Sequence, residues 1–580
     1  MVFEPLEDRT LLSLNFGWAL GLGSTGRDTG YSIATDAAGS VYVAGEIEGT
    51  VDFDPGPGTF NLTGVLDLFV AKYSNTGSLM WAQRLDTPSG WSQIAVDGSN
   101  HVYVGHLMAE ASGSEASVSQ LDASNGNVLW TTLLGSGTSG RAIAVDPSSG
   151  NVYFGGNIIS ATGEAGFVAK LDPTSSVLWL KQTSESSLMF PAGVAVDSSG
   201  NVYATGDYSG TVDFDPGPGT FSLSSIPSTK DWPTDAFIWK LNTNGEFVWA
   251  GSVGSDGRDG GTGIALDAAN NVYLTGHWRV GQSPKKTDFD PGPGTFKLTN
   301  KGNSDIFVLK LDANGNFVWA KSMGGQSMDI ASAVALDGSA NVYTTGEFFD
   351  RADFDPGPGT FYLESSLGPY SFPLGQVHTT DIFVSKLTSD GNFAAAASMG
   401  GDGSHDIGRG IALDTSGNVY TTGSFGGSDG STADFDPGPG TFNLTSNGRW
   451  DIFVSKLTQS SGGPLAAATV ETVGSNALAG GATPSDPGGL PNDPPVTPRQ
   501  PSTDPTPVAS KSPTASANPS SADLIGQALA EFSAATDHAC PTGRRAAERV
   551  GPRLGRLRPD PLSHDPAPWS LHEIPGPFFF

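Results

Sequence analysis

The sequence predicts an all-β protein, a seven-bladed β-propeller of four-stranded antiparallel blades. Three observations predict this fold: a Val-Tyr pair that occurs seven times, a set of short strand-like segments around each copy, and one unmatched segment near the N-terminus. The 580 residues include 78 Gly and 40 Pro, and only 16% are charged, so frequent turns are favoured over long helices. The regular period indicates one repeat fold in place of the several ordinary domains that this length would suggest.

The first two segments of each repeat are an apolar run that ends in Asp and the Val-Tyr segment. The runs end at Asp36, Asp97, Asp146, Asp197, Asp267, Asp337 and Asp414. The pairs begin at Val41, Val102, Val152, Val202, Val272, Val342 and Val419. β-Branched and aromatic residues bounded by Gly, Asn, Asp and Ser are typical of strands joined by tight turns. We therefore expect the seven aspartates to stabilise turns.

The third segment reads Asp-Ile-Phe-Val-Ser-Lys-Leu in its clearest copy, at residues 451–457, and its lysine is interpreted as a solvated or snorkelling strand residue. A fourth segment is marked by Trp81, Trp130, Trp179, Trp249, Trp319 and Phe393. The seventh repeat has no fourth segment, whereas a strand-like segment at residues 15–20 stands alone before the first repeat. We predict that this N-terminal strand completes the last blade as its outermost strand and closes the ring.

The repeated segments also carry a resemblance. Gly-Ile-Ala-Leu-Asp, Gly-Asn-Val-Tyr-Thr-Thr-Gly and Asp-Ile-Phe-Val-Ser-Lys-Leu resemble the bacterial seven-bladed β-propeller repeat (SBBP-type) family over residues 14–457. Residues 3–12 resemble a short Leu-Glu-Pro-Arg-type N-terminal motif of bacterial surface or secreted proteins, with Glu7 and Asp8 where that motif has Glu-Pro. The resemblance implies a propeller and an extracellular or cell-surface location, and it implies no reaction.

The remaining chain has a different composition. We divide it into an N-terminal motif segment (1–13), the propeller (14–457), a disordered linker rich in Pro, Ser, Thr and Gly (458–521), and a tail (522–580) with one short helix at 522–536. Cys540 is the single cysteine, so an internal disulfide is excluded. No signal peptide and no membrane-spanning segment are evident, and we expect a monomer.

One loop, Asp-Phe-Asp-Pro-Gly-Pro-Gly-Thr-Phe, occurs five times between the second and third strands and is missing from the second and third blades. The third strand opens with Asp in the same five blades, so an excursion that returns beside its own start should group three carboxylates. Such hard oxygen ligands suit Ca²⁺, whereas the alternative is that the loop aspartates accept hydrogen bonds from loop amides. The candidate Ca²⁺ ligands are Asp52, Asp54, Asp67, Asp213, Asp215, Asp235, Asp288, Asp290, Asp305, Asp353, Asp355, Asp381, Asp434, Asp436 and Asp451.

The charge of −30 argues against a nucleic-acid partner, because a phosphate backbone repels an acidic surface. Propeller topology places the five acidic loops on one face, with a notch over the second and third blades. We expect a protein or carbohydrate ligand on this face, either in the notch or in the central depression beside it. The alternative is that the loops only cap the edges of the blades.

Motifs for catalysis are scarce: there is no His-Glu-x-x-His, Gly-x-Ser-x-Gly, phosphate loop or sialidase-type Asp box. His405 and Asp406 are interpreted as a surface pair. The sequence therefore favours a non-enzymatic extracellular or cell-surface propeller that binds or scaffolds, stabilised by Ca²⁺. The alternative is a propeller enzyme, either a lyase or hydrolase with its site at the central channel or a quinoprotein-like dehydrogenase. Residues 121–130 resemble the tryptophan repeat of such dehydrogenases.

Overall fold

The computed structural model describes residues 13–460, apart from 89–90, 111–112, 187, 229–232, 280–285, 373–374, 404 and 428–429. The chain divides into two units, Met1–Glu471 and Thr472–Phe580, and all described residues belong to the first. In these residues the secondary structure is β throughout, and no helix is long and apolar enough to cross a membrane. The predictions for the N-terminal motif, the linker, the short helix and Cys540 lie outside the described residues.

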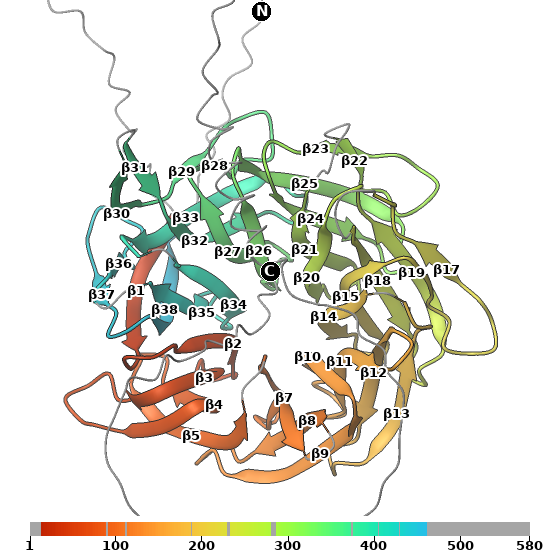
Figure 1. Cartoon of the computed structure of the whole chain (residues 1–580), viewed down its shortest axis with the longest axis horizontal. Helices are drawn as coiled ribbons and strands as arrows, with labels where there is room; N and C mark the ends of the chain where they lie inside the picture. The colour runs from red at the N-terminus through yellow and green to blue at the C-terminus, as the bar shows by residue number, and fades with distance from the viewer. Residues whose placement is uncertain are drawn as a thin grey trace, which may run out of the picture. The chain divides into compact units, whose positions relative to one another are not determined.

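Seven four-stranded antiparallel sheets are arranged around a common axis, which confirms the predicted propeller (Figure 1). From the innermost strand outward, the first three blades are β2 (Thr29–Thr35), β3 (Val41–Asp52), β4 (Asn61–Tyr73) and β5 (Leu79–Pro88); β6 (Gln93–Val96), β7 (Val102–Glu110), β8 (Gly113–Leu121) and β9 (Val128–Ser136); and β10 (Thr138–Val145), β11 (Val152–Ile159), β12 (Glu164–Leu171) and β13 (Val177–Gln182). The next three are β14 (Leu188–Val196), β15 (Val202–Ser209), β18 (Asp235–Leu241) and β19 (Phe247–Val253); β20 (Asp259–Leu266), β21 (Val272–Trp278), β24 (Asp305–Leu311) and β25 (Phe317–Gly325); and β26 (Asp329–Leu336), β27 (Val342–Phe349), β32 (Thr380–Leu387) and β33 (Phe393–Gly401).

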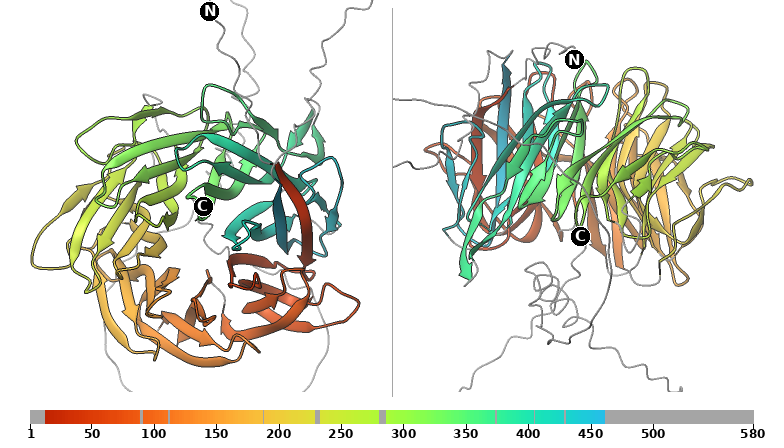
Figure 2. Two further views of the ribbon diagram at one scale, coloured as in Figure 1. Left: turned by 180° about the vertical axis from the view of Figure 1, so that it is seen from behind. Right: turned by 90° about the horizontal axis from the view of Figure 1, so that it is seen from above.

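The seventh blade is built from both ends of the described chain. It contains β34 (Ile407–Leu413), β35 (Val419–Gly426), β38 (Trp450–Ser460) and, outermost, β1 (Ser13–Leu22). β1 runs antiparallel to β38, from Ser13 opposite Ser460 to Leu22 opposite Ile452. In Figure 2 the red N-terminal strand lies against the blue C-terminal strands. The predicted closure of the ring by the N-terminal strand is confirmed.

Short hairpins extend the connection between the second and third strands of the later blades. They are β16 (Thr211–Asp213) with β17 (Ser222–Ser224), β22 (Lys286–Asp288) with β23 (Lys297–Thr299), β28 (Arg351–Asp353) with β29 (Tyr362–Glu364), and β36 (Thr432–Asp434) with β37 (Asn443–Thr445). The sixth blade carries a further hairpin, β30 (Leu367–Phe372) with β31 (Gly375–His378). In the first blade the same extension is a continuation of β3 and β4.

The core lies between adjacent blades, because each sheet is too thin to bury its own side chains. Tyr42 of the first blade, for example, is fully buried in a cluster with Ile94, Val102 and Val104 of the second. The tyrosines of all seven Val-Tyr pairs are buried in this way. The repeat therefore encodes contacts between neighbours as well as strands.

The aspartate that ends each innermost strand holds the following turn, as predicted. Asp36 accepts hydrogen bonds from the backbone N–H groups of Ala38 and Ser40, at 3.0 and 2.8 Å, and from the Tyr42 hydroxyl at 3.1 Å. In the other six blades the equivalent aspartate likewise accepts a backbone N–H from the turn. The turn role is confirmed.

The third-strand lysine was expected to be either solvated or snorkelling, and the solvated alternative is wrong. Lys170 is only 6% exposed, and its Nζ lies 5.2 Å from the ring centroid of Tyr153. It donates to the carbonyl oxygen of Thr243 in the next blade at 3.1 Å, and Trp179 Nε1 donates to the same oxygen at 3.1 Å. A lysine and a tryptophan of one blade thus bind one turn of the next, a contact that residue type alone does not indicate.

Candidate functional site

The five acidic loops fold on themselves. In the first blade, Asp52 Oδ1 accepts the N–H groups of Asp54 and Phe60, at 3.1 and 2.7 Å, and Asp54 Oδ1 accepts that of Gly56 at 2.8 Å. The same bonds are made by Asp213 and Asp215, Asp288 and Asp290, Asp353 and Asp355, and Asp434 and Asp436. These contacts match the alternative in which loop amides are the partners of the carboxylates.

The third-strand aspartate does not join the loop carboxylates, because the hairpin returns beside its start too early. Asp52 lies opposite Asn61, whereas Asp67 lies opposite Ile47, five residues before Asp52 in β3. At about 3.3 Å per residue this places Asp52 and Asp67 roughly 16 Å apart. Asp67 instead accepts a bond from Arg84 Nη1 at 2.8 Å. Within the described residues, no three acidic, histidine or cysteine side chains are grouped for one metal ion.

The other third-strand aspartates lie at the junctions between blades. Asp235, Asp305, Asp381 and Asp451 are at most 3% exposed. Each faces the crossover to the next blade, where Asp259, Asp329, Asp406 and Asp28, respectively, stand at the start of the innermost strand or directly before it. The interpretation of Asp406 as a surface residue is wrong: it is fully buried and accepts the N–H groups of Gly401 and Gly426, at 2.8 and 2.9 Å.

The excursions lie over the outer edges of the blades. β28 pairs with β25 and β36 pairs with β33, in each case the outermost strand of the preceding blade. Phe442, at the end of the last loop, stacks on Phe16 of β1 with ring centroids 4.7 Å apart. The second and third blades have no excursion, and there Leu129 and Leu178 are 57% and 52% exposed. The predicted notch is therefore a gap in the rim, and ligand binding there stays a prediction.

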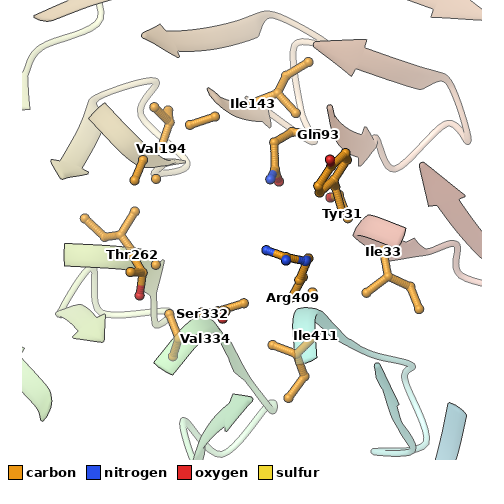
Figure 3. Close-up of a pocket in the computed structure, with 18 of the residues that line it drawn as sticks. Tyr31, Ile33, Gln93, Ile143, Val194, Thr262, Ser332, Val334, Arg409 and Ile411 are labelled. Atoms are coloured by element: carbon orange, nitrogen blue, oxygen red, sulfur yellow. The ribbon is translucent and has the colours of Figure 1, made fainter. Parts of the chain in front are cut away.

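The innermost strands carry a β-bulge in six of the seven blades. The bulged residues are Tyr31, Arg141, Ala192, Thr262, Ser332 and Arg409. A bulge turns one side chain out of the regular alternation, and bulges are over-represented beside active sites. Figure 3 shows Tyr31, Arg409 and the neighbouring Gln93 directed into the central channel. The residues lie near the start of each strand, at the face from which the acidic loops also leave.

Aromatic and guanidinium groups from five consecutive blades form a continuous chain of contacts, which we call the channel belt: Arg409, Tyr31, Trp91, Arg141 and Phe190. The Arg409 guanidinium lies 5.8 Å from the Tyr31 ring centroid, and the Tyr31 and Trp91 rings are 5.3 Å apart. The Arg141 guanidinium lies 5.4 Å from the Trp91 centroid and 5.0 Å from that of Phe190. Stacking on ring faces orients a guanidinium group and leaves its N–H groups, which lie in the guanidinium plane, available for hydrogen bonds.

Neither belt arginine forms an ion pair within the described residues. Among the residues that the structure describes, Arg409 Nε is buried without a hydrogen-bond partner. Three acids lie near the arginines: Asp207 and Glu164 near Arg141, and Glu347 near Arg409. Burial raises the pKa of Asp207 to about 7 despite the charge of Arg141. Burial likewise raises the pKa of Glu347, against the charge of Arg409. The positive charge of the belt is therefore incompletely neutralised near neutral pH.

A cavity of about 180 Å³ occupies the channel beside the belt. One aliphatic residue per blade lines it: Ile33, Ile94, Ile143, Val194, Ile264, Val334 and Ile411. Polar groups enter from Gln93, Thr262, Ser332 and Arg409. An apolar wall with a few placed polar groups is the usual composition of a small-ligand site.

Sequence reasoning named no residue of this channel. The signal was present, because the residue two positions before each lining aliphatic differs from copy to copy while the aliphatic residue and the following alanine recur. The seven variable residues are Tyr31, Ser92, Arg141, Ala192, Thr262, Ser332 and Arg409. In repeats that keep their structural residues, a position that varies and faces the axis is where function can be placed.

A family model described as a beta-propeller repeat (SBBP) matches residues 178–207 and 399–424. The chain carries beta-propeller repeats. Two curated relatives are similar: an uncharacterized WD repeat-containing protein L264 of Acanthamoeba polyphaga mimivirus is 26% identical over 37% of this chain and 16% of the relative, and the regulatory protein FlaEY of Caulobacter vibrioides is 23% identical over 40% and 21%. The aligned parts thus span under a quarter of either relative.

Solved structures with a similar arrangement include hydrazine synthase from Kuenenia stuttgartiensis, at 10% identity and a TM-score of 0.37 over 68% of this chain and 92% of that one. Sqt1 from Chaetomium thermophilum has 10% identity and a TM-score of 0.35 over 71% and 96%. A gluconolactonase from Xanthomonas campestris has 13% identity and a TM-score of 0.27 over 58% and 90%. At these values the likeness carries no information about function.

Proposed function

We propose that this propeller is a non-enzymatic binding module, and that its ligand is a carboxylate-bearing sugar unit, a uronate, held in the central channel by Arg409 and Arg141. The observation that carries the proposal is the pair of guanidinium groups held on ring faces without an ion pair. Guanidinium and carboxylate groups bind each other through two parallel charge-assisted hydrogen bonds. The channel therefore offers a local anion site in a strongly acidic protein.

The rest of the channel suits a sugar. Gln93, Thr262 and Ser332 supply amide and hydroxyl groups that bind ring hydroxyls. The volume of about 180 Å³ is below the roughly 300–1,000 Å³ of sites for drug-sized ligands, so we expect one terminal sugar unit to enter. The net charge of −30 repels anions at long range. Uronate binding should therefore depend on the belt arginines and not on the surface as a whole.

Calorimetric titration of the full chain with glucuronate and galacturonate tests this function. We expect both to bind, whereas glucose and galactose, which lack the carboxylate, should bind at least about tenfold more weakly because a charge-assisted bond contributes roughly 1.5–3 kcal/mol. Arg409→Gln should weaken uronate binding by a similar factor. Nuclear magnetic resonance of the same mixtures should show unchanged sugar, since turnover would support the enzyme alternative.

Arg351→Gln is the matched control for the belt arginines. Arg351 also stacks on an aromatic ring, 3.8 Å from the Tyr362 centroid, but it lies on a rim hairpin and forms an ion pair with Glu364 at 3.4 Å. Uronate binding should be unaffected by this change. Equal loss in the Arg351 and Arg409 variants, or equal affinity for neutral sugars, would refute the channel site, and binding of an acidic peptide in place of the sugars would reassign the ligand.

The setting that we propose is extracellular or at the cell surface. It is supported by the resemblance of residues 3–12 to a surface or secretion motif. Fractionation of producing cells should recover the full chain outside the cytoplasm and a variant without residues 1–12 inside it. An identical distribution of the two proteins would contradict this proposal.

A further inference from the structure

Four of the seven blade junctions bring together two aspartates that are far apart in the repeat. The pairs are Asp235 with Asp259, Asp305 with Asp329, Asp381 with Asp406, and Asp451 with Asp28. Backbone bonds fix the two strands beside each other. The N–H of Asp259 donates to the carbonyl of Thr234, and that of Asp329 to the carbonyl of Ser304, both at 2.9 Å.

The two carboxylates of a pair face each other across a glycine. A Cβ atom placed on Gly324 would lie 2.9 Å from Oδ1 of Asp305 and 2.9 Å from Oδ2 of Asp329. Oδ2 of Asp329 accepts the N–H of Gly325 at 2.6 Å. Gly23, Gly254 and Gly400 occupy the same place at the other three junctions, and a Cβ atom there would overlap the third-strand carboxylate. Any larger residue would fill the space on which the oxygens converge.

One oxygen of the third-strand aspartate has no partner at three of these junctions. Oδ1 of Asp235, of Asp305 and of Asp381 is buried without a hydrogen bond in the part of the chain that the structure describes, and the three residues are 2%, 0% and 3% exposed. Buried carboxylate oxygens are normally satisfied by a donor, a proton or a cation. The geometry places these oxygens against a second carboxylate, which supplies no donor when it is ionised.

At the three remaining junctions the Asp pair is missing, and the described residues that replace it do not leave an unpaired buried carboxylate. At the positions of the pair, the second and third blades have Glu115 and Thr138, which are bonded to Ser136 and to the N–H of Ala116. The third and fourth blades have Ala165 and Met189, both apolar and buried. The first and second blades have Asp67 and Ser89; Ser89 lies outside the described residues, and Asp67 pairs with Arg84. Where the innermost strand lacks Asp, the third-strand position is neutral or has another partner.

We propose that each of the three junctions with an unpartnered carboxylate oxygen binds one calcium ion between the third-strand aspartate of one blade and the aspartate at the start of the innermost strand of the next. At the fourth junction the two oxygens of Asp451 accept bonds from Ser446 and Asn447, and we assign no ion there. Carboxylate, carbonyl and water oxygens are the ligands that Ca²⁺ takes. The ion would bridge neighbouring blades and compensate two buried charges at once. The site uses Asp235, Asp305 and Asp381, but it replaces the loop aspartates of the sequence prediction with Asp259, Asp329 and Asp406, which the prediction omitted.

Calcium titration of the chelator-stripped full chain, followed by calorimetry and thermal unfolding, tests the site. We expect about three ions per chain, one for each junction with an unpartnered oxygen, and a melting temperature that rises with calcium. The double variant Asp305→Asn, Asp329→Asn should bind one ion fewer. Asp288→Asn, which neutralises a loop carboxylate of the same blade, is the matched control and should bind the full number.

Two results would overturn the proposal: no uptake of calcium by the stripped chain, or loss of an ion in the Asp288 variant with retention in the double variant. The double variant also reports on its own folding. Without calcium, removal of two facing carboxylates should raise the melting temperature at pH 8, so a folded and stabilised variant that binds one ion fewer is the expected result. Stabilisation without any calcium binding would mean that the pair holds only a shared proton.

The pH dependence of stability separates a proton from a calcium ion. Burial raises the pKa of Asp235 to about 7, and burial together with the charge of Asp235 raises that of Asp259 to about 8. A carboxyl group with a raised pKa stabilises the fold while it is protonated. In the presence of a chelator, the melting temperature should therefore fall as the pH rises from about 5 to about 9. Saturating calcium should remove most of this fall, because the ion takes the place of the proton.

Other charged side chains lie near three of the pairs and modulate their titration: Lys301 at Asp305 and Asp329, His378 and Asp402 at Asp381 and Asp406, and Glu48 at Asp28. The pKa values of Asp235 and Asp259 are set chiefly by burial and, for Asp259, by Asp235. The variant Asp235→Asn, Asp259→Asn should therefore give the clearest reduction of the pH-dependent fall in chelator.

Discussion

A variant that begins at residue 23, and so lacks β1, should unfold at a temperature roughly 10 °C below that of the full chain. β1 contributes nine backbone pairs with β38 and buries Leu14, Leu20 and Leu22, each of which contributes about 1.5–3 kcal/mol. Without it the seventh blade has an exposed edge and its packing against the first blade is incomplete. Thermal unfolding by circular dichroism measures the difference.

Two further variants make this prediction specific to ring closure. A variant that lacks only residues 1–12 retains β1 and should melt like the full chain. A circular permutant that begins at residue 23 and joins Ser460 to Ser13 through a short turn should also regain the stability, because these residues face each other at the end of an antiparallel pair. A permutant no more stable than the deletion variant would show that β1 acts in some other way.

The fold could be predicted because the residues that identify each strand lie within a few residues of the turn that bounds it. In each blade, Val-Tyr lies at the start of the second strand. The aspartate before it accepts hydrogen bonds from the turn between the first and second strands, as for Asp36. Even the long-range closure by β1 was predictable, since a propeller blade without a fourth strand leaves one place for an unmatched segment. Local signals and a count of strands were sufficient here.

The candidate sites could not be predicted in the same way, because their residues belong to different blades. Asp305 meets Asp329 only when two sheets pack together, and the sequence prediction assigned it to the nearest acidic loop instead. That loop returns beside its start at the wrong register, as Asp52 and Asp67 demonstrate. The belt arginines depend on bulges that change the direction of one side chain per strand, and a bulge has no clear sequence pattern.

The recurrence of the acidic loop is explained by its buried phenylalanine, and Phe214→Ala should consequently destabilise the fold by about 3–5 kcal/mol. Phe214 is fully buried, with its ring centroid 5.6 Å from that of Tyr208, 5.4 Å from Phe237 and 6.1 Å from Trp239. Its N–H donates to the carbonyl of Phe221 at 2.9 Å, so the same residue anchors the loop to the core and closes it. Chemical denaturation of the purified variant measures the loss.

Phe221→Ala is the control from the same loop, because Phe221 is 38% exposed and stacks on Phe247 at 4.9 Å. Its loss should cost roughly 1 kcal/mol, since much of its surface is already in contact with water. The difference between the two variants follows from the position of the excursion on the rim, where one ring enters the core and the other covers an outer strand. Equal losses of stability in the two variants would mean that the loop is not anchored by Phe214. The recurrence of the loop would then require a role for the aspartates beyond the hydrogen bonds that they accept from backbone N–H groups.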